Sequence, residues 1–277
     1  MLWLEAVERL RSRREVGVLV TVVQVRGHSP RDAGAKMVVS WNNAWDSIGG
    51  GNLEATAIDR AREMMGDPAA GPSIVTTALS DRTRGSHGVQ CCGGEVTLLL
   101  EPLPVLPAVA IFGVGHVGLE LARILSRHDL DLHLIDSRPE QLTDEVLRVL
   151  DDAHARVHPH HESVLPELVL SQLPPGAHVL VMTHDHAEDA ALCDAALRID
   201  GLGSIGLIGS RAKWIRFRTK LSEEGHDDAT IARITTPIGR PELSGKEPAT
   251  IAVSVAADLL QVFAREAQSY LPSEAQQ

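Results

Sequence analysis

The chain has 277 residues, with 26 Lys and Arg against 37 Asp and Glu, and its net charge of −11 argues against bulk attraction to nucleic acid or to an anionic membrane. Hydrophobic residues make up 44% and charged residues 23%, the balance of a globular protein, and the length fits two domains. Three cysteines, two of them adjacent, exclude a disulfide framework and favour a reducing compartment, so we expect a cytoplasmic protein without a membrane span.

Residues 1–104 show the pattern of an α+β domain. Glu5 and Glu8 lie inside the apolar pattern at the N-terminus, which is typical of an amphipathic helix rather than of a signal peptide. The polar residues 80–94 form a loop long enough to suggest a function. The expected helices cover residues 1–14 and 52–65, and the expected strands cover residues 16–25, 35–40, 73–79 and 95–100.

A proline-rich segment separates the two halves of the chain. Residues 101–107 contain three prolines, which cannot donate hydrogen bonds to a sheet and therefore favour an extended connector. Charge divides at the same place. Residues 1–104 contain 11 basic and 12 acidic residues, which gives a net charge of −1. Residues 105–277 contain 15 basic and 25 acidic residues, which gives a net charge of −10. We therefore expect two domains, residues 1–104 and residues 105–277.

The second half alternates strand and helix patterns. Such alternation predicts a mostly parallel sheet with helices on both faces, which places the chain in the α/β class with a Rossmann-like, doubly wound second domain. The expected strands cover residues 109–112, 131–135, 155–158, 178–182 and 204–208, and the expected helices cover residues 116–127, 139–150, 187–197, 210–223 and 248–267.

A glycine fingerprint, Gly113-Val114-Gly115-His116-Val117-Gly118, follows the first of these strands and begins a helix. In this context Gly113, Gly115 and Gly118 allow a tight turn, the approach of a phosphate and close helix packing. Asp136 ends the next strand, where a ribose-binding carboxylate would lie. These residues are compatible with an NAD-dependent oxidoreductase, and equally with a Rossmann domain whose glycines serve the fold alone.

The loop before residue 95 ends in Cys91-Cys92-Gly93-Gly94. Basic neighbours earlier in the loop would lower the pKa of a thiol and stabilise a thiolate. Two cysteines without a second pair of ligands are weak support for zinc. The alternative is that both cysteines are small packing residues at the start of a strand.

Two turns in the first half carry groups that bind anions. The segment 47–54 contains Gly49, Gly50, Gly51 and Glu54, and its backbone N–H groups could hold a phosphate or an oxo-anion. The segment 27–34 supplies the Ser29 hydroxyl and the Arg31 guanidinium, which could grip an anion. The alternatives are a tight strand-to-helix turn and a solvated arginine.

Further polar residues follow two strands of the second half. His184 and Asp185 come after the strand 178–182, and Ser210 and Arg211 come after the next strand. The carboxyl ends of parallel strands are where ligands bind in open α/β sheets. Helix capping is the alternative role for these residues. Histidines 158, 160 and 161 are expected to be solvated, and Cys193 is expected to lie in the core.

Taken together, these segments resemble the XdhC/CoxI family, and the QCCGG form resembles its XdhC branch. The matching segments follow the family's order and span nearly the whole chain. They are RGHSPRDAGAKMVVS (26–40), SIGGGNLEA (47–55), QCCGGEVTLLLEPL (90–103), FGVGHVG (112–118), VMTHDHAEDAALC (181–193), GLIGSRAKW (206–214), TPIG (236–239) and GKEPATIAVSVAADLL (245–260).

The resemblance implies a maturation factor rather than a catalyst. Such proteins bind the molybdenum cofactor, protect it, support its sulfuration and insert it into xanthine dehydrogenase. The implied partners are the molybdenum subunit of that enzyme and a cysteine desulfurase, and a homodimer is compatible with this role. The family's important cysteine maps onto Cys91 or Cys92, and Cys92 is the candidate contact to molybdenum. The candidate cofactor-binding residues are Ser29, Arg31, Gly49, Gly50, Gly51, Glu54, Cys91, Cys92, Gly93, Gly94, Gly113, Gly115, Gly118, Asp136, His184, Asp185, Ser210 and Arg211.

Overall fold

The computed structural model describes residues 1–67, 70–78, 94–161, 165–243 and 245–268. The chain divides into two compact units, one made of Met1–Val105 with the C-terminal residues from Ala264, and the other of Leu106–Phe263. Each unit has its own sheet and its own hydrophobic core, so each is described by itself.

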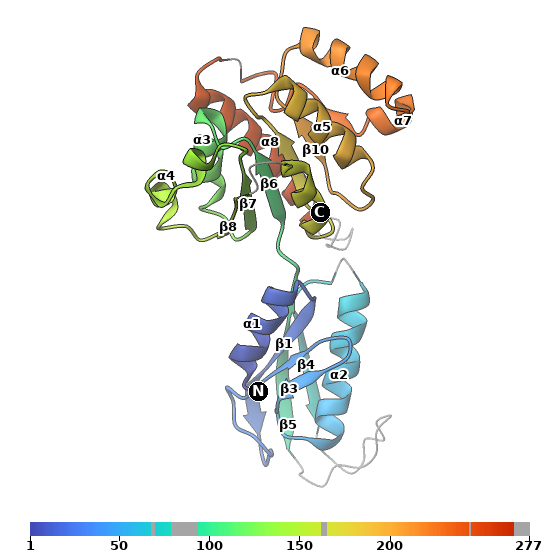
Figure 1. The fold of residues 1–277 in the computed structure, drawn as a ribbon. Helices are drawn as coiled ribbons and strands as arrows, with labels where there is room; N and C mark the ends of the chain where they lie inside the picture. Colours follow the sequence, from blue (N-terminus) through green and yellow to red (C-terminus); the bar gives the residue numbers. More distant parts are fainter. Residues whose placement is uncertain (68–69, 79–93, 162–164, 244, 269–277) are drawn as a thin grey trace. The chain divides into compact units, whose positions relative to one another are not determined.

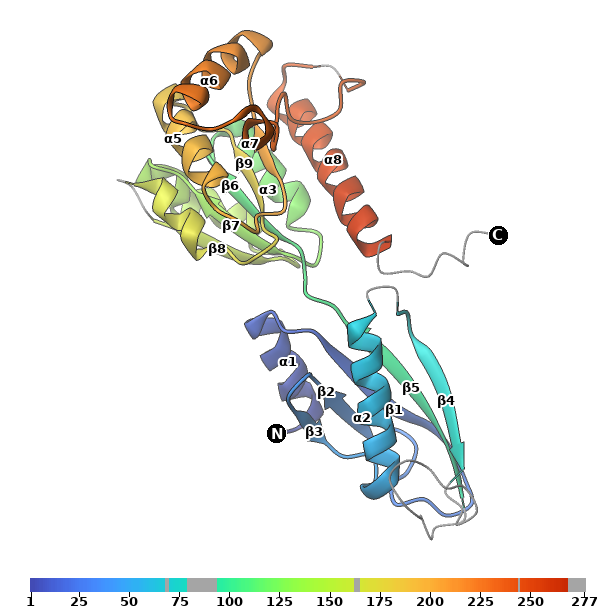
Figure 2. The ribbon, with the colours of Figure 1, turned by 90° about the vertical axis from the view of Figure 1, so that its right-hand side faces the viewer.

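The first unit is built on a five-stranded antiparallel sheet with the strand order β3-β2-β1-β5-β4 (Figures 1 and 2). Side chains of β1 alternate between the faces: Val18, Val20 and Val22 join the core beside α2, whereas Leu19 packs with α1. The elements are α1 (Trp3–Arg13), β1 (Gly17–Arg26), β2 (Lys36–Val39), β3 (Ala44–Asp46), α2 (Gly51–Gly66), β4 (Ser73–Ala78) and β5 (Glu95–Leu103).

The second unit contains a six-stranded parallel sheet with the strand order β11-β10-β9-β6-β7-β8 (Figures 1 and 2). When β6 to β11 are numbered 1 to 6 and the sheet is read from β8, the order is 3-2-1-4-5-6, as in dinucleotide-binding folds. The strand order reverses between β6 and β9, and this is the topological switch point of the sheet. The strands are β6 (Ala108–Phe112), β7 (Asp131–Ile135), β8 (Arg156–His160), β9 (His178–Val181), β10 (Ile205–Leu207) and β11 (Ile234–Thr235).

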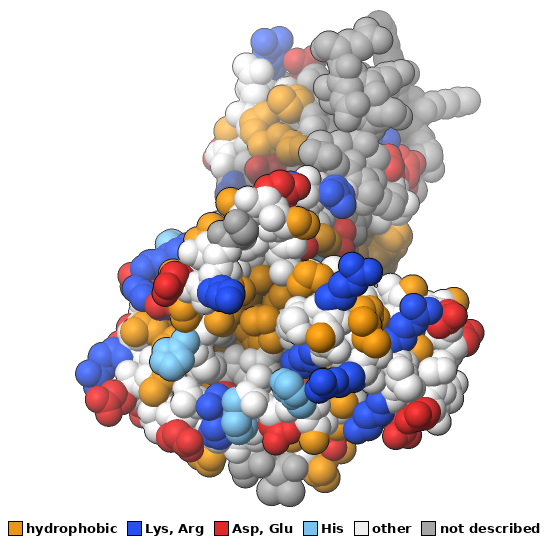
Figure 3. Space-filling model, turned by 90° about the horizontal axis from the view of Figure 1, so that it is seen from above, with side chains coloured by type: hydrophobic (Ala, Val, Ile, Leu, Met, Phe, Trp, Pro, Cys, Tyr) orange, Lys and Arg blue, Asp and Glu red, His pale blue; other side chains and the backbone are white. Residues whose placement is uncertain are grey.

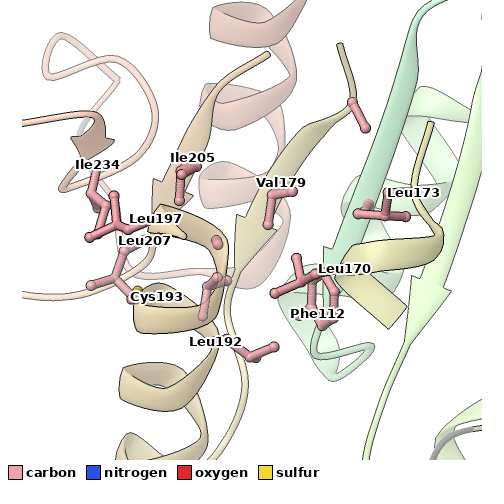
Figure 4. Packing of buried hydrophobic residues seen from close by; sticks show 14 of the residues in the cluster. Phe112, Leu170, Leu173, Val179, Leu192, Cys193, Leu197, Ile205, Leu207 and Ile234 are labelled. Atoms are coloured by element: carbon pink, nitrogen blue, oxygen red, sulfur yellow. The ribbon is translucent and has the colours of Figure 1, made fainter. Parts of the chain in front are cut away.

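Helices cover both faces of this sheet. One face packs against α3 and α8, and the other against α5, α6 and the 3₁₀ helix η3. Figure 4 shows the second of these cores, where Phe112 and Val179 of the strands meet Leu170, Leu192 and Cys193. The helices are α3 (His116–Leu125), η1 (Pro139–Leu142), α4 (Asp144–Leu147), η2 (Arg148–Leu150), η3 (Pro166–Gln172), α5 (His186–Leu197), α6 (Arg211–Glu223), α7 (Asp228–Ile231) and α8 (Pro248–Gln268).

Helix α8 has the length and composition of a membrane span, with a mean hydropathy of 1.2 over Pro248–Glu266. One such helix is weak evidence, because the core helix of a globular protein passes the same test. Ala252, Val255, Ala256 and Leu259 of α8 are buried in the core beside the sheet. This packing accounts for part of the apolar character of the helix, since 28% of the apolar window is buried.

The α/β class and the parallel Rossmann sheet of the second half are confirmed, and the sheet of the first half is antiparallel. The expected connector at 101–107 is wrong in part, because β5 continues to Leu103 and Pro102 pairs with Val18 of β1. The neighbouring strand β4 begins at Ser73, opposite Leu100, and does not reach Pro102. The missing N–H of Pro102 therefore faces a side without a partner strand. The domain boundary after residue 104 stays a prediction.

The helix expected over residues 139–150 is wrong as a single element. It is split into η1, α4 and η2, because the Thr143 hydroxyl accepts a hydrogen bond from the Val146 backbone and begins a new helix. The sequence did not predict β3, η3, α7 or β11, which are all short.

Candidate functional site

The glycine turn before α2 is an anion-binding arrangement of backbone N–H groups. Gly49, Gly50 and Gly51 all have positive φ angles, of 133°, 77° and 64°, which L side chains rarely adopt. The carboxylate of Glu54 occupies this arrangement. Its Oε1 accepts hydrogen bonds from the backbone N–H groups of Ile48 at 3.1 Å, Gly49 at 3.2 Å and Gly50 at 2.8 Å.

The Ser47 hydroxyl donates a fourth hydrogen bond to the same Glu54 oxygen, at 2.5 Å. Burial raises the pKa of Glu54, but the hydrogen bonds from Ser47 and from the three backbone groups lower it by more, so this pKa lies below its ordinary value. A ligand phosphate at this turn would have to displace Glu54. The binding of an external anion by Gly49, Gly50 and Gly51 therefore stays a prediction.

The change Glu54→Gln tests this arrangement. We expect it to lower the free energy of unfolding by about 1–3 kcal/mol at pH 7, because a charged acceptor of four hydrogen bonds becomes neutral. A carboxylate with a lowered folded-state pKa stabilises the fold above its unfolded pKa, and this contribution is lost as the pH falls through the folded pKa. Urea unfolding of both proteins between pH 7 and pH 3 should show the difference shrinking below about pH 4.5. A difference that is constant over this range would contradict the account.

Three sequence segments meet at this end of the first unit. A Cβ atom on Gly49 would lie 3.0 Å from Cβ of Pro30, so the turn with Ser29 and Arg31 packs on the glycine turn. A Cβ atom on Gly94 would overlap with the backbone carbonyl of His28. Gly94 is thus required for the close approach of the residue before β5 to the 27–34 turn.

Ser29 and Arg31 differ in their surroundings. The Ser29 hydroxyl is buried and has no hydrogen-bond partner within the described part of the chain. Arg31 is exposed. Cys91, Cys92 and Gly93, together with the basic residues of their loop, lie outside the described residues, so of the QCCGG segment only Gly94 is placed.

The glycine fingerprint lies at the carboxyl end of β6, as the sequence predicts. Gly113 has a φ of 105°, and a Cβ atom there would overlap with the backbone carbonyl of Met182 at the end of β9. A Cβ atom on Gly118 would overlap with the carbonyl oxygen of Gly113. Both glycines are therefore fixed by packing within the protein. Gly115 is the N-cap residue of α3, and the backbone N–H groups at this helix start are available to an anion.

Asp136 is 3% exposed and is fully engaged by protein groups. Its Oδ2 accepts a hydrogen bond from the Val114 N–H at 2.7 Å, which ties β7 to the glycine turn. Arg138 donates through Nε and Nη2, both at 2.9 Å, and through its backbone N–H at 3.0 Å. Burial raises the pKa of Asp136, but these hydrogen bonds and the charge of Arg138 lower it by more.

The four hydrogen bonds use the acceptor capacity of the Asp136 carboxylate. The hydroxyl groups of a ribose would therefore need to displace Arg138 to reach it. Arg138 also lies near the turn itself, because a Cβ atom on Gly115 would be 3.7 Å from its Nη2. The role of Asp136 in binding a nucleotide stays a prediction.

A second carboxylate, Glu188, lies beside this turn. The Ser137 hydroxyl donates to its Oε2 at 2.8 Å, which connects the end of β7 with the first turn of α5. Burial raises the pKa of Glu188, the hydrogen bond from Ser137 opposes this, and the nearby charge of Asp136 adds to the rise. The pKa of Glu188 is therefore raised above its ordinary value, which favours the protonated form of its carboxyl group.

A buried ion pair joins the loops after β9 and β10. Asp189 is fully buried, and its carboxylate accepts hydrogen bonds from the Thr183 backbone at 3.0 Å and hydroxyl at 2.7 Å. Its other oxygen lies 2.5 Å from Nζ of Lys213, whose side chain is 11% exposed. Lys213 also donates to the backbone carbonyl of Ile208 at 2.9 Å. The Asp189–Lys213 pair thus holds α5 and α6 against the carboxyl ends of β9 and β10.

The remaining predicted residues at this edge are exposed and act in part as helix caps. Asp185 accepts hydrogen bonds from the N–H groups of Ala187 and Glu188 and caps α5. The Ser210 hydroxyl accepts from the Lys213 N–H at 3.3 Å and caps α6. His184 and Arg211 are exposed next to these caps. Figure 3 views this end of the second unit and shows a hollow with hydrophobic side chains in its floor and Lys, Arg and His around it.

Sequence reasoning missed the Asp189–Lys213 pair and the Ser137–Glu188 contact. A signal for the pair was present, because Asp189 interrupts the buried side of an otherwise apolar helix, and a buried carboxylate needs a cationic partner. The sequence could not identify that partner, because Lys213 lies on another helix.

The histidines of β8 are not simply solvated. His158 and His160 stack on His133 of β7, with ring centroids 4.7 and 5.2 Å apart, and His133 Nδ1 lies 2.9 Å from His160 Nε2. Within the described ranges, no group of three or more His, Cys, Asp or Glu side chains has the geometry of a metal site. Cys193 is buried as predicted, and burial raises the pKa of its thiol to about 12, so it is a core residue without thiolate character.

Comparisons with known proteins agree with the fold. Residues 10–76 match the model of the XdhC and CoxI family, and residues 109–259 match the XdhC Rossmann domain. A relative in Escherichia coli (strain K12), the uncharacterized protein YqeB, is 25% identical over 244 residues. The match covers 88% of this chain but 43% of YqeB, so the chain spans less than half of that relative's length.

Two solved structures match the chain at low sequence identity. A structure described as a xanthine dehydrogenase (BH1974) from Bacillus halodurans has a TM-score of 0.48 and 20% identity, with 98% of each chain covered. The tRNA N6-threonylcarbamoyladenosine dehydratase TcdA of Escherichia coli has a TM-score of 0.43 and 14% identity, covering 58% of this chain and 88% of that one. The match to the XdhC Rossmann domain spans more than half of the residues, and on that evidence the chain belongs to the XdhC and CoxI family.

Proposed function

We propose that this protein is a cytoplasmic maturation factor of xanthine dehydrogenase that binds the molybdenum cofactor, protects it, supports its sulfuration and delivers it. Family membership supports the accessory role. In this role the protein is a carrier rather than a catalyst. Its partners would be the molybdenum subunit of the enzyme and a cysteine desulfurase, and a homodimer is compatible with delivery to a multimeric enzyme.

The observation that carries the proposal is the close packing at Gly94. This residue directly follows Cys91, Cys92 and Gly93, and its lack of a side chain lets it pack against the turn that holds Ser29. The Ser29 hydroxyl there is buried and has no partner in the described ranges. The two cysteines that precede Gly94 in the sequence suit a ligand with a soft metal, because thiolates are the side chains that bind soft metals.

The cofactor is an anionic pterin that carries a phosphate and holds molybdenum through a dithiolene. Cys92 is the proposed molybdenum contact, with Cys91 as its neighbour. Backbone N–H groups at the start of α3, near Gly115, are one proposed place for its phosphate. Those around Gly49 and Gly50 are another, which requires that the phosphate displace Glu54. The carboxyl-edge residues His184, Asp185, Ser210 and Arg211 remain proposed contacts.

Single substitutions of the three cysteines test the proposal. We expect Cys92→Ala to lose most of the molybdenum that co-elutes with the wild-type protein from cofactor-producing cells, and Cys91→Ala to lose part of it, because a soft ligand is removed. Cys193→Ala is the matched control, since its buried thiol has a pKa of about 12 and forms no thiolate at neutral pH. Metal analysis and pterin fluorescence after gel filtration give the readout. Undiminished molybdenum in both loop variants would contradict the role of the thiols.

An NAD-dependent oxidoreductase is the second candidate, favoured by the glycine fingerprint and by the strand order of the second unit. The carboxylate that would bind the ribose, Asp136, instead binds Val114 and Arg138. A nucleotide in this position would have to rearrange Arg138. The first candidate does not need that rearrangement, and for this reason we place it first.

A further inference from the structure

Two sequence segments that resemble the family have no role in the site above, and the structure brings them together. One pocket of about 550 Å³ in the second unit is lined by Pro237, Ile238 and Gly239 of the segment TPIG (236–239) and by Gly245 and Lys246 of the segment 245–260. None of the fingerprint residues 113–118 lines it. The lining residues are Pro237, Ile238, Gly239, Arg240, Pro241, Leu243, Gly245, Lys246, Ile251 and Ser254.

Residues 238–240, in the first part of the pocket lining, are held by contacts with β10 and α8. The Ser254 hydroxyl of α8 accepts a hydrogen bond from the Arg240 N–H at 2.7 Å and lies 3.2 Å from the Arg240 carbonyl. Gly206 of β10 has no side chain, and a Cβ atom there would lie 2.7 Å from Cγ2 of Ile238. Gly239 has a φ of 86° and packs against Ser254. The fixed positions of residues 238–240 suit ligand binding, because little ordering of this part of the lining is required.

The chemistry of the lining is apolar with two cations. Ile238, Leu243 and Ile251 supply apolar surface, and no acidic side chain is among the lining residues. The Arg240 guanidinium donates to the neutral Gln261 side chain at 3.1 Å and lies 3.8 Å from Glu242, so its charge is only weakly compensated. Lys246 is exposed, and the structure describes no ion pair for it.

A buried polar atom lies at the start of the same loop. The Thr236 hydroxyl has no hydrogen-bond partner within the described ranges. Buried polar groups are normally paired, so an unpaired hydroxyl next to a pocket suggests a missing ligand or water. The volume falls within the range of pockets that hold small organic ligands.

We propose that this pocket binds a phosphate monoester carried on a flat heterocycle, with the ring on the apolar wall and the phosphate between Arg240 and Lys246. Nucleotides and phosphorylated pterins share this chemistry. The assignment of the pocket to the pterin end of the cofactor rests on the proposed function. The pocket's preference for a phosphate monoester on a flat heterocycle is independent of that function. If the pocket holds the pterin end of the cofactor, the phosphate lies here and not at the backbone N–H groups near Gly115 or around Gly49 and Gly50.

Calorimetric titration with GMP, guanosine and inorganic phosphate tests the pocket. GMP is the probe because it joins a purine ring to a single phosphate. We expect GMP to bind at least about tenfold more tightly than guanosine or phosphate alone, and Lys246→Ala to weaken GMP binding about tenfold, because one charge-assisted contact is lost. Lys246→Arg should retain most of the affinity. The matched control is Lys220→Ala, which removes one exposed charge from α6 outside the pocket.

Equal affinity of Lys246→Ala and Lys220→Ala for GMP, or no preference for GMP over guanosine, would overturn the proposal. Both lysines are exposed, so neither change should affect folding, and a thermal melt checks this. In a second arm, cofactor-loaded Lys246→Ala should lose pterin faster on dialysis than loaded Lys220→Ala. If the wild-type protein carries no cofactor but GMP binding depends on Lys246, the proposed function fails and the pocket stands. If the cofactor is retained equally by both variants, the pterin assignment fails.

Discussion

Replacing Asp189 with Ala is expected to lower the free energy of unfolding by about 3–5 kcal/mol, because it leaves the Lys213 cation buried without its partner. The Asp189 carboxylate is fully buried and also accepts both hydrogen bonds from Thr183. Those donors would lose their acceptor in the same variant. Urea unfolding at pH 7 measures the effect.

The matched control is Asp228→Ala, which breaks an ion pair with Arg218 at the surface. The two side chains are 80% and 57% exposed, so we expect a loss below about 1 kcal/mol. The double variant Asp189→Ala with Lys213→Met should recover part of the loss, because the unpaired cation is removed. Equal losses for Asp189→Ala and Asp228→Ala would contradict the view that the buried pair holds the carboxyl-edge loops.

Gly118→Ala is the second change with a large expected effect. Alanine in place of glycine within a helix normally gains up to about 1 kcal/mol. Here the new Cβ atom would overlap with the carbonyl oxygen of Gly113, a backbone atom that cannot rotate away. We expect a loss of about 3 kcal/mol or more, together with displacement of the glycine turn.

A second helical glycine provides the control for this change. A Cβ atom on Gly66, the last residue of α2, would lie 3.6 Å from the Trp41 ring, an ordinary contact. Gly66→Ala should therefore change the free energy of unfolding by less than about 1 kcal/mol. Thermal unfolding of both variants gives the comparison. A stable Gly118→Ala protein would mean that the turn can move away from α3.

The regular elements of the fold were predictable from local pattern. The strand over residues 108–112 and the helix after it follow from a buried apolar run and three glycines at fixed spacing. By contrast, β3 is only three residues long and ends in Asp46, which has a φ of 65°, so it leaves almost no periodic signal. The break of the helix at Thr143 depends on one cap, which competes with a continuous apolar pattern.

The positions of candidate site residues were more predictable than their partners. Spacing placed Asp136 at the end of β7, but its hydrogen bonds come from Val114 and Arg138, and these depend on the path of the turn. Glu54 was expected to contact an external ligand, yet the structure shows it bound to its own glycine turn. The sequence contains both anion-binding groups and anions, and only the geometry shows which of them are already paired.

The central claim is that this protein carries the molybdenum cofactor, and one measurement tests it most directly. Wild-type protein purified by gel filtration from cofactor-producing cells is analysed for molybdenum, pterin fluorescence and NAD. We predict that molybdenum and pterin co-elute with the protein in a fixed ratio and that NAD does not. Retained NAD without molybdenum or pterin would contradict the account and favour an oxidoreductase that uses the glycine fingerprint.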